Sequence, residues 1–248
     1  MAATVSISNS LMNSDRESIA NMRRRASQMR TSALFSDLTW EECTYLAHLA
    51  KSKDLARNET LFQQGTALRT VSLIESGAIK LLQTRPAGEE VVLWVRGEGE
   101  SVETPSDRRN ARHTCTARAV EASAVLSWET DEFHKLSIEF PVIGRNMQRI
   151  LQARMAELEE RYCEMAIDNV MCRLASALRR LMLSIGKEDV EGIYIGISRM
   201  DLGKMTGITK FTISRIITEW TNDGMVLPLR EALIVRSPDK LHALCGVL

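Results

Sequence analysis

Residues 198–224, SRMDLGKMTGITKFTISRIITEWTNDG, combine apolar positions at helical spacing with a polar face. The first half has apolar residues on one side of a short helix: Met200, Leu202 and Met205. Gly207 then supplies the small residue that a tight turn needs, and Thr209 or Thr212 can cap a second helix. The second helix has an apolar face formed by Ile213, Ile216, Ile217 and Trp220. The stretch therefore predicts a helix-turn-helix.

The opposite face of the second helix carries Lys210, Phe211, Ser214 and Arg215 near its amino end. With Thr209 and Thr212 these are the candidate DNA-binding residues. A recognition helix places side chains there to reach base edges in the major groove of duplex DNA. A guanidinium such as that of Arg215 can donate to both acceptors on the edge of guanine. Phe211 cannot accept a hydrogen bond, so it contacts a thymine methyl or turns into the protein. These residues predict DNA as the partner, whereas spacing alone also suits an ordinary helical hairpin.

The segment that precedes this motif reads as short strands. Residues 31–50 predict a short helical segment, and residues 54–135 alternate β-rich runs with glycine, asparagine and proline. Many short strands at near-regular spacing predict a roll or a barrel. Residues 96–112 are polar and charged and predict a long loop.

Residues 139–165 predict one long helix that starts near Pro141. Apolar residues recur along it at 4-3-4-3 spacing: Leu151, Met155, Leu158, Tyr162 and Met165. This spacing is the seam of a coiled coil, and charged residues such as Glu159 and Arg161 flank it. We therefore favour a dimer seam over a helix packed only on its own β-domain.

The carboxyl-terminal part continues with alternating elements. Residues 168–185 predict an amphipathic helix capped by Asp168 or Asn169, and residues 186–197 predict a turn or small hairpin. After the recognition helix, residues 225–227 and 232–235 suggest the two-stranded wing of a winged helix.

Charge is divided unevenly along the 248 residues, although the formal net charge is zero. Residues 169–248 hold 11 Lys and Arg against 8 Asp and Glu, a net charge of +3. Residues 31–168 hold 16 against 22, a net charge of −6. An acidic unit and a mildly basic one are thus separate, and phosphate contacts must be concentrated on one face of the basic unit.

The cysteines and the amino-terminal residues indicate the cellular compartment of the protein. Five scattered cysteines without a CxxC pair predict free thiols in a reducing cytoplasm. Residues 1–30 lack the apolar region of a secretory signal, and no run is long enough for a membrane helix. We expect a mobile polar extension there; an arm that touches DNA or a partner subunit is the alternative.

No motif of a hydrolase, metalloprotease, nucleotide phosphatase or dinucleotide enzyme is present, so an enzyme is not expected.

Residues 209–215, Thr-Lys-Phe-Thr-Ile-Ser-Arg, resemble the recognition helix of the Crp–Fnr family of bacterial transcription regulators. Asp201-Leu202-Gly203 before the run and residues 220–226 after it fit the same family. Further upstream, Leu61–Gly65, Glu75–Leu81, Gly88-Glu89-Glu90 and Gly99-Glu100-Ser101 look like segments of a cyclic-nucleotide-binding β-roll.

The resemblance implies an α+β fold made of a β-roll, a long dimerisation helix and a winged helix-turn-helix. The expected division is an extension (1–30), an effector or sensor domain (31–138), the dimerisation helix (139–167) and a DNA-binding domain (168–248). It implies a homodimeric, effector-controlled transcription regulator that binds a palindromic operator and contacts RNA polymerase. The alternative is an effector-binding module of the same fold that has no DNA-binding function.

The resemblance also points to an effector site at Glu100, Ser101, Arg112, His113 and Thr114. Members that bind cyclic AMP use a glutamate for the ribose and an Arg-Ser pair for the phosphate. Here Glu100 matches the glutamate, while the Arg-Ser pair aligns with His113-Thr114, or with Arg112-His113 if the loop shifts by one residue.

Cyclic AMP is not expected to bind tightly, because a neutral histidine is a poor partner for a buried phosphate. Leu158 and Glu159 also replace the Thr-Ser pair that meets adenine in those members. His113 beside Cys115 leaves haem ligation open, although an ordinary strand end is the simpler interpretation. An iron–sulfur cluster is not expected, because residues 1–42 contain no cysteine.

Overall fold

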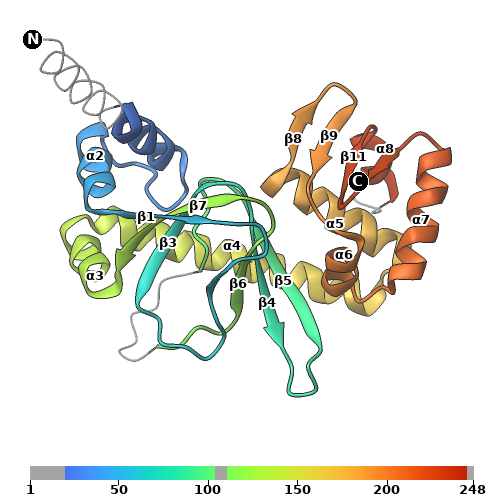
Figure 1. Cartoon of the computed structure of the whole chain (residues 1–248), viewed down its shortest axis with the longest axis horizontal. Helices are drawn as coiled ribbons and strands as arrows, with labels where there is room; N and C mark the ends of the chain where they lie inside the picture. The colour runs from blue at the N-terminus through green and yellow to red at the C-terminus, as the bar shows by residue number, and fades with distance from the viewer. Residues whose placement is uncertain (1–19, 104–110, 245–248) are drawn as a thin grey trace, which may run out of the picture.

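The computed structural model describes residues 20–103 and 111–244. A β-roll and a helical unit with a small sheet lie next to each other, and one long helix runs along both (Figure 1). The expected α+β fold class is confirmed. Among the described helices, none is both long and apolar enough to cross a bilayer.

The β-roll consists of two antiparallel sheets with a shared core. One sheet has the order β1-β7-β3, with bounds Lys51–Leu55, Ser123–Glu129 and Thr70–Ser76. The other has the order β2-β6-β4-β5, with bounds Thr60–Phe62, Thr116–Ala119, Ile79–Thr84 and Glu90–Arg96. Inward-facing residues such as Ile74, Leu81 and Val125 form the core cluster of the roll. Strand β3 is buried at five successive positions and β4 at four, because apolar clusters lie on both faces of these strands.

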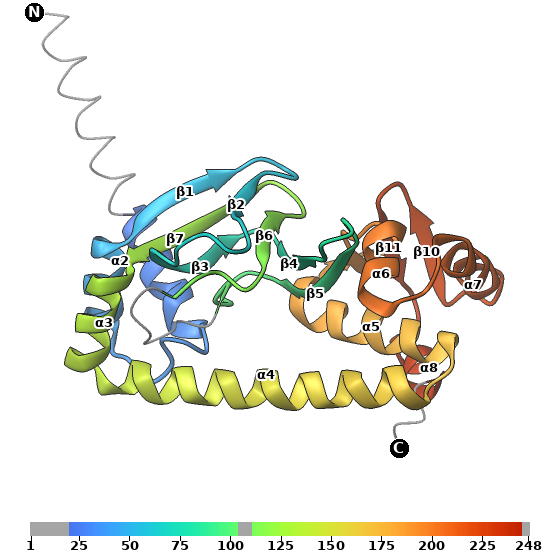
Figure 2. The same ribbon diagram turned by 90° about the horizontal axis from the view of Figure 1, so that it is seen from below.

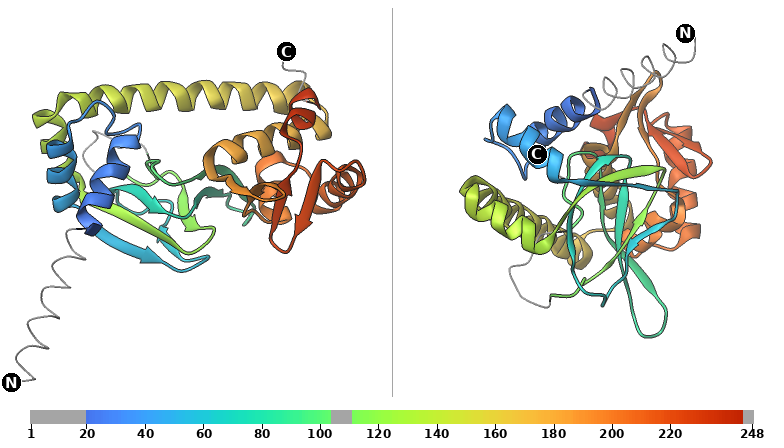
Figure 3. Two further views of the ribbon diagram at one scale, coloured as in Figure 1. Left: turned by 90° about the horizontal axis from the view of Figure 1, so that it is seen from above. Right: turned by 60° about the vertical axis from the view of Figure 1, so that its left-hand side comes forward.

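Helices cover one end of the roll (Figure 3). Residues 20–31 are helical, α2 spans Trp40–Leu49 and α3 spans Thr130–Glu139. Thr39 and Glu42 form a capping box that fixes the start of α2. These helices share an apolar cluster with β3 and β7, in which Trp128 is fully buried.

The amino-terminal segment differs from the expected polar extension. Residues 1–19 lie outside the described residues, but residues 20–31 pack on the roll with Ala26 and Met29 fully buried. Arg24 and Arg25 pair with the buried carboxylate of Glu75 at 2.6 and 3.0 Å. The helix thus has an apolar side and a specific ionic anchor, which a pattern search for signal sequences does not detect.

Helix α4 spans Pro141–Ile167 and forms one long side of the molecule (Figure 2). Pro141 occupies the first turn, where its missing N–H costs nothing, and a break at Phe140 separates α4 from α3. Helix α3 was not expected from the sequence. It is short, and its apolar residues Phe133 and Leu136 are buried against the roll.

The carboxyl-terminal unit is a winged helix-turn-helix. Its helices are α5 (Val170–Ile185), α6 (Arg199–Thr206), α7 (Lys210–Asn222) and α8 (Pro238–Leu244). Its sheet has the order β10-β11-β9-β8, with bounds Val226–Leu229, Ala232–Val235, Gly192–Ile195 and Lys187–Asp189. The Asn169 side chain caps α5 by accepting from the N–H groups of Met171 and Cys172, which decides between the two expected caps.

The β-roll and the helix-turn-helix unit share one apolar cluster. Val92 and Val95 of β5 and Leu82 of β4 belong to the same buried cluster as the cores of α5, α6 and α7. Within this contact, Lys80 of β4 donates to Asp201 of α6 at 2.7 Å, and both side chains are buried. At its edge, Lys204 of α6 pairs with Glu90 of β5 at 2.6 Å. Polar and apolar contacts therefore hold α6 on the roll.

Replacing Lys80 with methionine should lower the free energy of unfolding, measured in urea, by about 3 kcal/mol, because Asp201 would keep a buried charge without its cation. The matched control is Lys51→Met, which removes the exposed Lys51–Glu129 pair and should cost about 0.5 kcal/mol or less. Equal small losses for the two variants would show that the Lys80–Asp201 pair does not stabilise the contact.

Candidate functional sites

The helix-turn-helix is defined by caps at both sides of its turn. Ser198 caps α6 by accepting from the N–H of Asp201 at 3.0 Å. Helix α6 ends at Gly207, whose φ of +67° is costly for any residue with a Cβ. Thr209 caps α7 by accepting from the N–H of Thr212 at 3.2 Å. Thr209 rather than Thr212 is therefore the cap.

The inner face of α7 is the apolar one expected from the sequence. Its four residues are almost completely buried: Ile213, Ile216, Ile217 and Trp220. On α6, Leu202 is fully buried, but Met200 is 58% exposed and does not join the core. The expected apolar side of α6 is therefore wrong at Met200, because Ser198 and Asp201 already occupy the buried start of this helix.

The outer face of α7 is open. Lys210 and Arg215 are exposed, and the ring of Phe211 is 88% exposed. Within the described part of the chain, none of these three side chains makes a hydrogen bond or an ion pair. Ser214 and Thr212 are half-buried beside them. This face presents two cations and one aromatic ring without an intramolecular partner.

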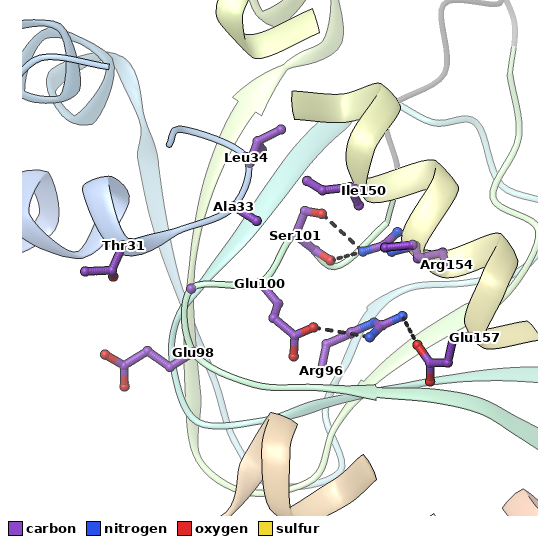
Figure 4. A pocket seen from close by; sticks show the side chains of 12 residues that line it. Thr31, Ala33, Leu34, Arg96, Glu98, Glu100, Ser101, Ile150, Arg154 and Glu157 are labelled. Carbon is purple, nitrogen blue, oxygen red and sulfur yellow. Dashed lines mark hydrogen bonds and ion pairs between the residues drawn. The ribbon is translucent and has the colours of Figure 1, made fainter. Parts of the chain in front are cut away.

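A second candidate site is a cavity of about 580 Å³ between the roll and α4 (Figure 4). The turn after β5 contributes Glu100 and Ser101, which are two of the expected effector residues. Arg154 of α4 donates to the carbonyl and hydroxyl oxygens of Ser101 at 2.7 and 3.1 Å. Desolvation lowers the pKa of Arg154 to about 10, so its guanidinium still carries a charge at neutral pH.

Arg96 lies at the centre of this cavity's polar wall. It donates to Glu100 at 3.2 Å, and its other terminal nitrogen lies 3.6 Å from Glu157 of α4. Sequence reasoning missed Arg96, Arg154 and Glu157. The sequence did carry a signal for Arg96. This arginine follows directly on the apolar run Val91–Val95, and a cation at the end of a buried strand is itself buried, as Arg96 is.

The other expected effector residues lie away from the cavity. Arg112 is exposed and donates to the carbonyl oxygen of Gly65 at 2.6 Å. His113 is buried, bonds the carboxylate of Glu103 at 2.5 Å and stacks on Phe62. Neither residue, nor Thr114, is among the described residues that line the cavity.

The cyclic-nucleotide arrangement therefore does not fit these residues. Glu100 lies in the cavity as expected, but its carboxylate is held by Arg96, by the N–H of Gly97 and by Ser184. The positions aligned with the phosphate clamp supply an exposed arginine and a histidine bound to a carboxylate. No fixed cation from residues 112–114 faces a phosphate beside Glu100.

The pair His113 and Cys115 does not present a ready thiolate to a haem iron. The Nδ1 atom of His113 bonds the carboxylate of Glu103, and the ring of Phe62 stacks on the imidazole. Burial raises the pKa of the Cys115 thiol to about 12, which disfavours the thiolate that would bind a metal. Among the described residues, no cluster of three or more His, Cys, Asp or Glu side chains could hold a metal ion.

The apolar residues that were expected to form a dimer seam are exposed on α4. The five side chains are between 48% and 76% exposed: Leu151, Met155, Leu158, Tyr162 and Met165. The side of α4 that faces away from the β-roll is open along most of the helix (Figure 2), but at its end the side chain of Met165 lies beside the turn at Gly207. On the inner face, Ile150, Arg154 and Glu157 line the cavity. The two faces of the helix therefore differ in their surroundings.

Comparisons with known proteins agree with this architecture. Residues 52–139 match the cyclic nucleotide-binding domain, and residues 172–244 match the Crp-like helix-turn-helix domain. The chain is 23% identical to the transcriptional activator protein Anr of Pseudomonas protegens, over 84% of this chain and 86% of that protein. It is 24% identical to the cyclic AMP receptor protein of Thermus thermophilus, over 80% of this chain and 89% of that protein.

A solved structure shows the same fold. FixK2 from Bradyrhizobium japonicum is 17% identical and superposes with a TM-score of 0.69, covering 80% of this chain and 98% of that chain. The two matched domains occur here in the same order, joined by the long helix α4. The chain therefore belongs to the Crp–Fnr family of DNA-binding transcription regulators.

Proposed function

We propose that this regulator binds a palindromic operator as a homodimer, with α7 of each copy in the major groove. The observation that carries the proposal is the outer face of α7, where Lys210, Phe211 and Arg215 are exposed without a partner in the described chain. A cationic, unpaired face at the amino end of a second helix suits base edges and phosphates.

Each residue of this face has its own role in the proposal. Arg215 donates to guanine through its guanidinium fork, and Lys210 meets a base or a phosphate. Phe211 presses on a thymine methyl, since it is too exposed to act as a core residue. Thr209, Thr212 and Ser214 contact the backbone phosphates around these bases. Members of the family that carry glutamate at the position of Phe211 can accept from cytosine there, so we do not expect this protein to recognise the half-sites of those members.

The proposed dimer pairs the outer faces of two α4 helices. Five large apolar side chains in one exposed stripe are unusual on a monomer's surface, and they recur at the spacing of a coiled-coil seam. A twofold axis through this seam would place two α7 helices on one side of DNA, about one helical turn apart.

The remaining assignments follow from the family. Residues 31–138 form the sensor, residues 139–167 the dimerisation helix and residues 168–248 the DNA-binding domain. The regulator works in the cytoplasm, contacts RNA polymerase from its operator and has no enzymatic activity. Control by an effector is supported by the cavity between the roll and α4, which joins the sensor to the dimerisation helix.

Replacing Arg215 with alanine should remove specific operator binding and leave dimerisation intact. Loss of a bidentate contact costs about 1–3 kcal/mol at one base position. The measurement is fluorescence anisotropy with an operator selected from random duplexes, repeated at several salt concentrations. The control is Lys51→Ala on β1, which also removes one exposed cation.

An Arg215→Ala protein with unchanged operator affinity would remove this residue from the readout. A wild-type protein that shows no salt-dependent retention of any duplex would instead favour an effector-binding module without DNA function.

Replacing Leu158 with glutamate should yield monomers, because like charges would face each other across the seam. Sedimentation velocity of the full chain gives the oligomeric state. The matched control is Leu183→Glu on α5, since Leu183 is also an exposed leucine but lies outside the seam. Monomers only for the first variant are expected, whereas a Leu158→Glu dimer means that the subunits pair elsewhere.

A further inference from the structure

The guanidinium of Arg96 is buried without enough acceptors. Arg96 is 8% exposed, and its Nε and Nη2 atoms have no hydrogen-bond acceptor in the described chain. Its carbon Cζ lies 4.7 Å from the ring centroid of Trp94, which holds the flat group by a cation–π contact. Donors that are buried and unpaired are costly, so a site with two of them on one cation indicates a missing acceptor.

The carboxylates near Arg96 do not supply that acceptor. Glu100 already accepts from Arg96 Nη1, from the N–H of Gly97 and from Ser184. Glu157 lies 3.6 Å from Nη2, beyond hydrogen-bond reach, and its side chain is partly exposed on α4. Glu157 can therefore move toward solvent when a better-placed anion arrives, and the net charge of the site is then unchanged.

The rest of the cavity is suited to an apolar body. Ala33, Leu34 and Ile150 lie on the side away from Arg96 and Glu100 (Figure 4), and Ala153 also lines the cavity. Its volume of about 580 Å³ falls within the ordinary range of small-molecule sites. A planar guanidinium at one end and apolar side chains at the other define an amphipathic ligand.

We propose that this cavity binds a small organic acid, whose carboxylate replaces Glu157 at Arg96 and whose apolar body lies against Leu34, Ile150 and Ala153. The inference rests on the proposed sensor role of residues 31–138. It assigns the ligand to the end of β5 and to α4, and not to residues 112–114. The fork of an arginine matches the two oxygens of a carboxylate, which a lysine cannot do.

The site also touches the DNA-binding unit. Glu100 joins Arg96 to the hydroxyl of Ser184, and Ser184 lies on α5 of the helix-turn-helix unit. A carboxylate that binds Arg96 would weaken the bond between Arg96 and Glu100. Because Glu100 also accepts from Ser184, the contact between the roll and α5 would change as well.

Calorimetric titration of the full chain with hexanoate and with benzoate tests the proposal, with hexanamide as the uncharged control. Saturable binding of at least one acid, and none of the amide, is expected. Arg96→Lys should weaken acid binding about 10- to 100-fold, because a point charge replaces the fork. Glu157→Gln should strengthen binding, because it removes the competing carboxylate. Ala153→Phe, on the partly open rim, should block the cavity without altering any charge.

Three results would overturn the proposal: no saturable heat with either acid, equal binding of hexanamide, or acid binding that Ala153→Phe leaves unchanged. Saturable binding of cyclic AMP that persists in Arg96→Lys would also contradict the ligand class. Thermal unfolding of each variant shows whether it is folded. If Arg96→Lys does not fold, the Glu157→Gln variant still tests the proposal. Operator binding is measured separately, so failure of the acid site leaves the proposed DNA function standing.

Discussion

The contact between the β-roll and α6 determines where the recognition helix points. The carboxylate of Asp201 accepts two hydrogen bonds there. One comes from Lys80 of the roll, and the other comes from the hydroxyl of Ser198 at the start of α6. The surrounding apolar cluster excludes water, so this ion pair is retained only in one geometry. Because α7 follows α6 through the short turn at Gly207, the outer face of α7 takes its orientation from the same contact.

Helix α4 is the second constraint, because its inner face lines the cavity and its outer face carries exposed apolar side chains. With 3.6 residues per turn, Ile150, Arg154 and Glu157 lie toward the roll, while Leu151, Met155 and Leu158 lie outward. Glu157 and Leu158 are neighbours in sequence, so the change that the proposed ligand would cause on the inner face lies within one turn of the proposed dimer seam. Short connections would thus join the proposed sensor, the proposed seam and the helix-turn-helix unit.

Much of this fold was predictable because its elements depend on local rules. The recognition helix follows from the spacing of Ile213, Ile216 and Trp220, and the turn follows from Gly207, as the structure confirms. The family resemblance is confirmed by the matches to both domain models. Local rules failed where burial depends on a distant partner: residues 20–31 pack on the roll through Met29 and Glu75, and Met200 remains exposed.

The sequence by itself determined the family and the order of the units, and it predicted the residues that would contact DNA, since these depend on short-range spacing and side-chain chemistry. Only the tertiary structure decided which charged residues meet. It placed Arg96 with Glu100 and Arg154 with Ser101, left Arg112 on the surface, and paired Lys80 with Asp201 across 121 residues. The physical reason is that a buried charge is tolerated only beside its partner, and that partner is chosen by how sheets and helices pack rather than by separation along the chain.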